Sequence, residues 1–283
     1  MVAAAVAVVL GGGLAACGSS NNGGSSGHTT AAVACTPSGL KHLLYKPGAL
    51  TVATDNPVYT PWFVNNTPGN GKGYESAVAY AIAKQLGFSK SQVTWVHEPF
   101  NSTYAPGPKA FDFDINEVSY TPQRAQAVTF SNSYYPVQQS IIALKGSPIV
   151  TKHSPAQLKG YLYGDEIGTT GLTYIGTQIQ PSRQPKVFNT LALAVSALEA
   201  HRVDALVVDT PDAQYMASSQ VKHGVLVAQF PSVGEHYGLV FAKGNQMVGC
   251  VNKAIATLTS NGTLPALQKK YLQVYLQFPV IQP

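Results

Sequence analysis

Residues 50–57 read LTVATDNP, an apolar, β-rich run that reaches Asp55 and then stops at a proline. Residues 75–86 follow with apolar side chains at helical spacing, and a glycine comes directly after them. We therefore predict a strand followed by a helix. A second apolar run, residues 205–208, also ends in an aspartate, Asp209, with a proline two residues later. The plan of a strand that ends in an acidic residue thus occurs twice in the chain.

Strand and helix patterns alternate along the rest of the chain. The patterns predict strands at residues 93–97, 111–115, 141–144 and 237–242, and helices at residues 191–198, 251–258, from 264 onward, and after Thr121-Pro122. Such alternation implies an α/β fold with largely parallel sheets that are covered on both faces. Ligands of such sheets bind beyond the carboxyl ends of the strands, so we expect Asp55 and Asp209 to face a common cleft. Alternatively, Asp209 only caps the helix expected from Pro211.

The composition argues against several classes of function. The chain has 283 residues, of which 11% are charged, and its 18 Lys and Arg are scattered among Gly, Ser, Thr and Pro and do not gather in runs. Nucleic-acid binding needs clustered cations, so no nucleic-acid partner is expected. The 7 His show no HExxH spacing and the 3 Cys no CxxC, so the sequence predicts no metal site and no cofactor.

The N-terminal residues have the pattern of an export signal. Residues 2–10 are wholly apolar, and residues 14–17, Leu-Ala-Ala-Cys, resemble a bacterial lipobox. The apolar run is too short to span a membrane but suits a secretory signal. We predict a signal peptide at residues 1–16, lipidation of Cys17, a flexible tether at residues 17–36, and a protein anchored to the outer face of the cell membrane. The alternative is an Ala-rich tail that arose by chance.

Two further cysteines remain, Cys35 and Cys250. Outside the cytoplasm an even number of cysteines tends to be oxidised. A disulfide between them would close a loop of roughly 200 residues, for which chain-entropy models give about 5 kcal/mol of stabilisation. The sequence leaves two readings open, a disulfide or two free thiols.

Seven short motifs follow one another in a recognisable order. They are Thr54-Asp55 with Tyr59, Pro61, Trp62 and Phe63; Gly73-Tyr74-Glu75; residues 111–119 with Thr121-Pro122-Gln123-Arg124; Phe130-Ser131 with Tyr134-Tyr135; Gly168-Thr169-Thr170; Val203-Asp204-Ala205 with Asp209-Thr210-Pro211; and Asn261-Gly262-Thr263 ahead of Lys269-Lys270-Tyr271. In this order they resemble the extracellular solute-binding proteins of family 3, the periplasmic amino-acid-binding type that supplies ABC transporters.

The resemblance implies a two-lobed periplasmic-binding-protein fold of type II, with the second lobe inserted into the first. On this basis we expect the chain to cross between the lobes near Ile141 and Leu239. The first lobe would hold residues 37–141 and 239–283, and the second lobe residues 142–238. Cys35 and Cys250 would then belong to the same lobe.

The resemblance also implies how a ligand is held by its backbone groups. Arg124 matches the arginine that takes the α-carboxylate in a two-pronged pair, and Asp209 matches the carboxylate that pairs with the α-ammonium. One grip from each lobe couples binding to closure. Residues with hydroxyl groups at matching positions complete this part of the expected site: Ser119, Thr121, Thr169 and Thr170.

The expected side-chain pocket departs from the family pattern. Tyr59 matches the aromatic that covers the ligand, although one extra residue separates Asp55 from Pro61. Trp62 replaces a phenylalanine and is expected as a wall or core residue, and Asn116 is a candidate polar contact.

Glu117 occupies a position that is usually Gly or Ser in the family. Together with Asp55 it would favour a ligand with a cationic or strongly hydrogen-bonding side chain. The alternative is that Glu117 faces solvent at the rim of the lobe.

Taken with the resemblance, the sequence predicts the substrate-binding lipoprotein of an ABC importer. The protein would be a monomer that captures a polar amino acid, basic ones included, and delivers it to a membrane permease. One alternative is a dehydratase-like enzyme acting on a small cyclic acid on the same scaffold, and another is a ligand-sensing receptor subunit. A set of residues that holds both α-groups still favours binding over catalysis.

Overall fold

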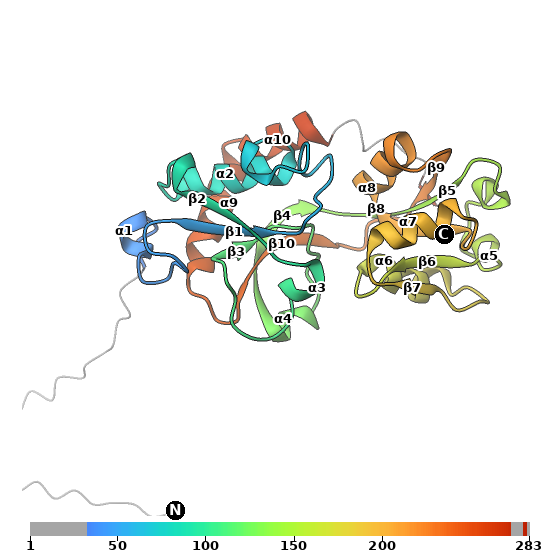
Figure 1. Ribbon diagram of the computed structural model, residues 1–283, viewed down its shortest axis with the longest axis horizontal. Helices are drawn as coiled ribbons and strands as arrows, with labels where there is room; N and C mark the ends of the chain where they lie inside the picture. The colour runs from blue at the N-terminus through green and yellow to red at the C-terminus, as the bar shows by residue number, and fades with distance from the viewer. Residues whose placement is uncertain (1–32, 273–279, 282–283) are drawn as a thin grey trace, which may run out of the picture. The chain divides into compact units, whose positions relative to one another are not determined.

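The computed structural model describes residues 33–272 and 280–281. The expected signal peptide, Cys17 and most of the expected tether lie outside these residues. Within the described part, two five-stranded sheets form the centres of two lobes (Figure 1). No helix in this part combines the length and the apolar character that a membrane crossing requires.

The first lobe is built on a sheet with the strand order β2-β1-β3-β10-β4. Its strands are β1 (Leu50–Thr54), β2 (Val93–His97), β3 (Phe113–Asp114), β4 (Val128–Pro136) and β10 (His236–Ala242). Its helices are α1 (Pro37–Leu40), α2 (Tyr74–Gln85), α3 (Phe100–Thr103), α4 (Arg124–Ala127), α9 (Met247–Ser260) and α10 (Thr263–Tyr271), with short helical turns at η1 (Pro68–Asn70) and η2 (Lys90–Gln92).

The second lobe is built on a sheet with the strand order β7-β6-β8-β5-β9. Its strands are β5 (Gln139–Leu144), β6 (Tyr163–Glu166), β7 (Lys186–Phe188), β8 (Ala205–Asp209) and β9 (Gly224–Gln229). Its helices are α5 (Pro155–Leu158), α6 (Thr170–Tyr174), α7 (Leu191–Glu199) and α8 (Thr210–Tyr215), with short helical segments at η3 (Pro148–Thr151), η4 (Ile175–Ile179) and η5 (Met216–Gln220).

Both sheets mix parallel and antiparallel strands. The strands β1, β2 and β3 run parallel, as do β6, β7 and β8. The strands next to the lobe crossings, β4, β10, β5 and β9, pair antiparallel. The expectation of largely parallel sheets therefore fails at these strands, because the chain leaves one sheet directly for the other there and no helical crossover intervenes.

The chain passes between the sheets in two places. Val137 and Gln138 join β4 to β5, and residues 230–235 join β9 to β10, so the second lobe is inserted into the first. Ile141 and Leu239, expected near the crossings, lie within β5 and β10 instead. Both are fully buried sheet residues.

The C-terminal residues also differ from the expected division of the lobes. Val280 forms a parallel bridge with Gln229 at the end of β9, and the Ile281 N–H donates to the Gln229 carbonyl over 2.7 Å. Ile281 is buried in the apolar core of the second lobe, although the sequence assigned it to the first. Exposing this isoleucine would forfeit the burial of its side chain, about 2 kcal/mol.

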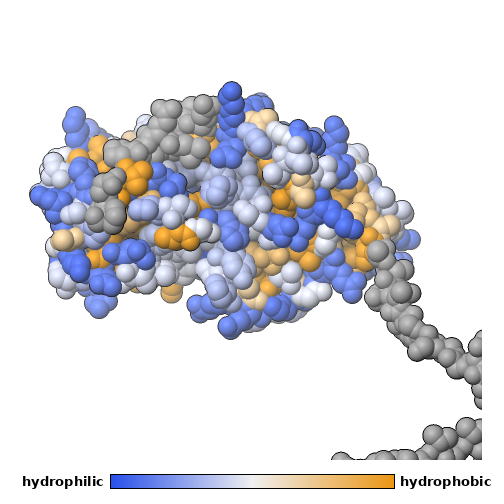
Figure 2. Space-filling view, turned by 180° about the vertical axis from the view of Figure 1, so that it is seen from behind, coloured by the Kyte–Doolittle hydropathy of each residue, from blue (hydrophilic) through white to orange (hydrophobic). Residues whose placement is uncertain are grey.

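Each lobe has its own apolar core. In the first lobe, α2, α9 and α10 cover one face of the sheet, where Val78 and Ile82 of α2 are fully buried (Figure 1). Cys35 and Cys250 form a disulfide with a Cα–Cα distance of 5.2 Å, which ties the segment before α1 to α9. On the face seen in Figure 2, hydrophobic side chains are scattered among hydrophilic ones.

Candidate functional site

Arg124 lies at the start of α4 in the first lobe and is buried. Its backbone N–H donates to the Thr121 hydroxyl over 3.1 Å. The helix begins at Arg124 with Gln123 at the cap position, so the expected start at Thr121-Pro122 lies in the preceding turn. Burial lowers the pKa of the Arg124 guanidinium from its ordinary value, which reflects the cost of a buried charge.

The Arg124 guanidinium contacts only neutral groups. Its Nη1 donates to the Ser119 carbonyl over 2.7 Å, and its Nη2 donates to the Gly168 carbonyl of the second lobe over 2.8 Å. The ring of Tyr104 lies 4.2 Å from the guanidinium carbon. Within the described residues no carboxylate forms an ion pair with Arg124. This buried cation therefore suits an anionic group of a ligand.

Thr169 and Thr170 of the second lobe follow Gly168, which contacts Arg124, and they have different roles. The Thr169 hydroxyl caps α6 by accepting from the Leu172 N–H over 3.1 Å. The Thr170 hydroxyl accepts from Nε2 of Gln139 over 3.2 Å. Thr169 thus shapes the start of the helix, whereas Thr170 belongs to a hydrogen-bonded group that includes Gln139.

Asp209 ends β8 and directs its carboxylate toward the crossing strands. It occupies the cap position of α8, but its side chain makes no capping hydrogen bond, so the capping alternative is wrong. Instead, its oxygens accept from Gln139 Nε2 and from the Tyr237 hydroxyl. Burial raises the pKa of Asp209 well above its usual range, and the neighbouring carboxylates of Glu235 and Asp212 add to the shift.

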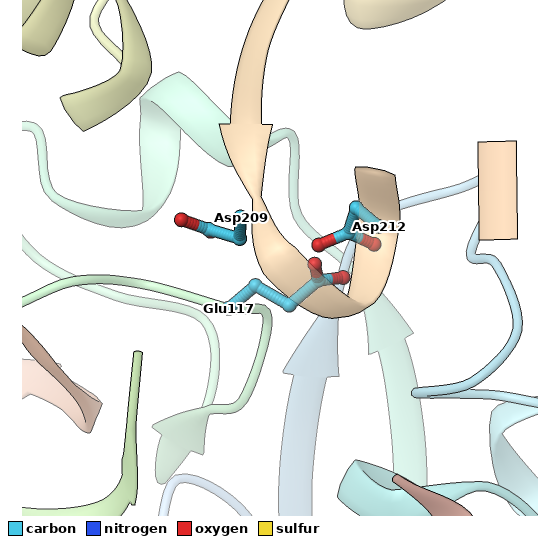
Figure 3. Close-up of side chains that lie close together, drawn as sticks. All are labelled: Glu117, Asp209 and Asp212. Atoms are coloured by element: carbon cyan, nitrogen blue, oxygen red, sulfur yellow. The ribbon is translucent and has the colours of Figure 1, made fainter. Parts of the chain in front are cut away.

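Glu117 and Asp212 meet beside Asp209. One oxygen from each of these three residues lies within 4.8 Å of the others. Figure 3 shows the carboxyl group of Glu117 turned toward that of Asp212, while the Asp209 carboxylate points away from this pair. Burial raises the pKa of Asp212 to about 6 and that of Glu117 well above its usual value, and the closeness of the two carboxyl groups contributes to the shift of Glu117. Glu117 faces this cluster and not the solvent at the rim.

The backbone of Glu117 has a φ of 55°, in the left-handed region that favours glycine. Two contacts hold it there. Its N–H donates to Oε1 of the fully buried Glu75 over 2.8 Å, and its side chain reaches Asp212. Glu75 also accepts from the Tyr134 hydroxyl, and burial raises its pKa to about 8. Such an uncommon conformation, held by side chains from other elements, is typical of a functional position.

Trp62 links the apolar core to the acidic cluster. Its indole Nε1 donates to Oδ1 of Asp212 in the other lobe over 2.8 Å. The fully buried ring packs edge-on against Tyr74, Tyr135 and Tyr237. Trp62 is therefore a core residue whose polar edge also reaches the site.

Asp55 and Glu117 do not come together. The Asp55 carboxylate pairs with Nε2 of His97 at 3.1 Å and accepts from the Phe100 N–H at 3.3 Å. The half-buried Tyr59 lies near Asp55, and burial raises the pKa of its hydroxyl. Asn116 is buried, and its Nδ2 has no partner among the described residues.

Three site residues were missed in the sequence: Glu75, Asp212 and Glu235. Asp212 follows Asp209 at a spacing of three, which is the spacing that brings side chains together at a helix start, and this signal was available. Glu75 was taken only as part of a helix opening. Glu235, which accepts from the Ser119 hydroxyl over 2.7 Å, lies in a crossing segment that carries no local pattern.

Carboxylates within 4.8 Å of one another are also the ligand type of Ca²⁺ and Mg²⁺, although the sequence predicted no metal site. The same oxygens suit an ammonium or guanidinium group. The arrangement as a whole offers an anion-accepting group at Arg124 and cation-accepting groups at Glu117, Asp209 and Asp212.

Comparison with known proteins gives one consistent result. A model of the bacterial extracellular solute-binding proteins, family 3, matches residues 50–274. The L-arginine-binding protein of Pseudomonas aeruginosa is 26% identical over 237 residues, covering 78% of this chain and 90% of that protein. The structure of an ancestral arginine-binding protein bound to arginine matches with a TM-score of 0.66 and 26% identity, covering 80% of this chain and 98% of the other.

A second solved structure is an ancestral amino acid-binding protein described as a precursor of cyclohexadienyl dehydratase. It matches with a TM-score of 0.65 and 26% identity over 80% of this chain and 96% of the other. The family model covers most of the chain and agrees with the inserted two-lobe fold. The chain belongs to the bacterial extracellular solute-binding proteins, family 3.

Proposed function

We propose that the protein is the solute-binding subunit of an ABC importer, which captures a polar amino acid between its lobes and delivers it to a membrane permease. One observation carries the proposal. Arg124 of the first lobe is buried with only neutral partners, while the half-buried Asp209 of the second lobe accepts hydrogen bonds from neutral donors. A zwitterion supplies one opposite charge for each.

In this mechanism the α-carboxylate binds Arg124 and the α-ammonium binds Asp209. Gln139 donates hydrogen bonds to both the Thr170 hydroxyl and the Asp209 carboxylate and so connects the two. Thr170 supports the ligand from the second lobe. Because the two charged contacts come from different lobes, the ligand stabilises the closed arrangement more than the open one. The relatives named for arginine and histidine binding support an amino acid as the ligand.

Catalysis on a small cyclic acid is the second candidate. The raised pKa of Glu117 favours the protonated form of this carboxyl group, which is the form a dehydratase needs as its proton donor, and a structural relative is described as a precursor of such an enzyme. Against this, Glu117 is already engaged with Asp212, and the Arg124 and Asp209 contacts suit a ligand held still. We therefore propose binding without catalysis.

For its location we propose an exported monomer held to the outer face of the membrane by a lipid on Cys17. The family is extracellular, and the disulfide between Cys35 and Cys250 is typical of oxidising compartments. Labelling with a radioactive fatty acid tests the anchor. The wild-type protein should take up label and stay in the membrane fraction, whereas Cys17→Ser should do neither.

A thermal-denaturation screen tests the main proposal. The purified protein is heated with each common amino acid in turn, and with prephenate. A cognate amino acid should stabilise the folded protein by about 4 kcal/mol at a thousandfold excess over its dissociation constant. If no amino acid raises the melting temperature, or if prephenate is consumed, the proposal is wrong.

A further inference from the structure

The acidic part of the candidate site holds a large share of the acidic residues of the chain. Of only 13 Asp and Glu, five are in contact with this region: Glu75, Glu117, Asp209, Asp212 and Glu235. The protein as a whole carries a net charge of +5. Gathering scarce carboxylates in one buried place is costly unless positive charge arrives there.

The side chains that surround these carboxylates supply no such charge. Their hydrogen-bond donors are neutral and belong to Trp62, Tyr237 and Gln139. Within the described residues, no Lys, Arg or His nitrogen lies within 4.0 Å of the Glu117, Asp209 or Asp212 oxygens. The positive charge of Arg124 interacts electrostatically with Asp209 and Glu235. Glu117 and Asp212 are not among its electrostatic partners.

Two buried atoms next to the cluster also lack a donor. Glu75 is fully buried, and its Oε1 contacts the Glu117 N–H while its Oε2 has no partner among the described residues. Gln139 is 1% exposed, and its Nε2 donates to Asp209 while its Oε1 is likewise without a partner. Both unpartnered atoms are acceptors. A group with several N–H donors and a positive charge is the chemical complement of this arrangement.

Glu117 and Asp212 come from different lobes and lie close together. Glu117 follows β3 in the first lobe, and Asp212 lies in the first turn of α8 in the second. Two ionised carboxylates in contact oppose closure of the lobes, because like charges repel strongly where water is excluded, so closure without a cation requires that one of them takes up a proton. A cation between them removes this cost. A neutral ligand leaves the cost of repulsion or proton uptake in place and is bound less tightly for that reason.

We propose that Glu117 and Asp212 form a subsite for a positively charged group on the ligand side chain, so that the lobes close tightly only on a cationic amino acid. The inference rests on the proposed function and names its substrate class. Asp209 remains free for the α-ammonium, since its carboxylate points away from the Glu117–Asp212 pair (Figure 3).

Asp55 is the other acidic residue that the sequence suggested for this role. Its oxygens already have three partners, His97 and the backbone N–H groups of Asn56 and Phe100. Asp55 therefore has less need of a ligand cation than the Glu117–Asp212 pair. A comparison of substitutions at the two places separates the hypotheses.

The experiment compares L-arginine with L-citrulline, which has nearly the same shape but an uncharged side-chain end. Isothermal titration calorimetry measures both affinities for the wild-type protein, Glu117→Gln, Asp55→Asn and the exposed control Glu199→Gln. The wild-type protein should prefer arginine by about a hundredfold, because hydrogen bonds to charged groups are the strong ones. Glu117→Gln should reduce this preference to about tenfold or less, and Glu199→Gln should keep the wild-type preference.

The outcomes separate the inference from the proposed function. Equal affinities of the wild-type protein for arginine and citrulline would overturn the inference and leave amino-acid binding intact. A loss of preference in Asp55→Asn but not in Glu117→Gln would also overturn it. Stabilisation by CaCl₂ or MgCl₂ without any amino acid, abolished by Asp212→Asn, would assign the carboxylates to a metal ion. If no amino acid binds at all, the proposed function fails and the inference fails with it.

Discussion

The two ends of the candidate site treat charge in opposite ways. At one end the Arg124 guanidinium is surrounded by carbonyl oxygens and the Tyr104 ring, all neutral acceptors of a positive charge. At the other end Glu117 and Asp212 have mainly each other. Without a ligand, the Arg124 guanidinium still has carbonyl oxygens as hydrogen-bond acceptors. The two carboxyl groups of the acidic end are stable side by side only with a proton or another cation present.

This difference assigns the two ends different tasks. On the proposed function, the Arg124 end would recognise the α-carboxylate, a group common to all amino acids, and so would supply affinity without choosing among them. The acidic end would respond to the charge of the side chain and so would supply selectivity. Substitutions and conditions that act on one end only are therefore the way to test the division.

The largest effect is expected at the Arg124 end. Arg124→Ala removes the partner of the α-carboxylate and should weaken binding of arginine and citrulline alike by about a hundredfold or more, because an unpaired buried charge remains. Isothermal titration calorimetry measures this, with the exposed Arg183→Ala as the matched control. A variant that loses arginine but keeps citrulline would contradict the division of tasks.

The second effect is a dependence of stability on pH. The folded-state pKa values of Glu75, about 8, and Asp212, about 6, are raised above their ordinary values, mainly by burial, so the folded protein binds more protons than the unfolded chain. This contribution to stability is present in full below about pH 4 and is lost as the pH rises through the folded values. Between about pH 5 and about pH 8, the free energy of unfolding of the ligand-free protein should fall by on the order of 5 kcal/mol.

No nearby group reverses this sign. The titratable groups that face the cluster are Tyr134 of β4, Tyr237 of β10, Glu235 of the crossing segment, Asp209 and Glu117, and the one cation with influence there, Arg124, stays charged throughout this pH range. Urea denaturation at several pH values measures the change, and saturating arginine should flatten it because the ligand cation replaces the proton. Stability that increases toward alkaline pH would argue against the uncompensated cluster.

The smallest effect is expected at the contact between the lobes. Gly168 has a φ of 81°, and a Cβ there would lie 2.6 Å from the Tyr104 hydroxyl of the first lobe. Gly168→Ala should weaken the binding of every amino acid ligand by about fivefold, near 1 kcal/mol, without changing the preference for arginine. Gly176→Ala, where a Cβ meets nothing within 4 Å, is the control. Equal losses in both variants would contradict a role of Gly168 in closure.

The sequence alone was sufficient for the fold class, and it named Arg124 as a candidate ligand contact. The apolar runs and helical spacings of β1, α2 and β8 follow from local preferences, and the order of motifs identified the family with Arg124 and Asp209. It placed the lobe crossings only approximately, near Ile141 and Leu239, because Val137, Gln138 and the segment 230–235 carry no periodic pattern that differs from an ordinary loop.

The acidic end depends on the tertiary structure. Glu117 was already unusual in the sequence. The other members come from separate elements: Glu75 lies at the start of α2, Asp212 at the start of α8, and Glu235 in a crossing segment. They are brought together by the packing of two lobes whose contacts join distant parts of the chain, such as Trp62 with Asp212. Local patterns fix strands and helices, whereas the charge balance of a buried site is a sum over residues that only the folded chain makes neighbours.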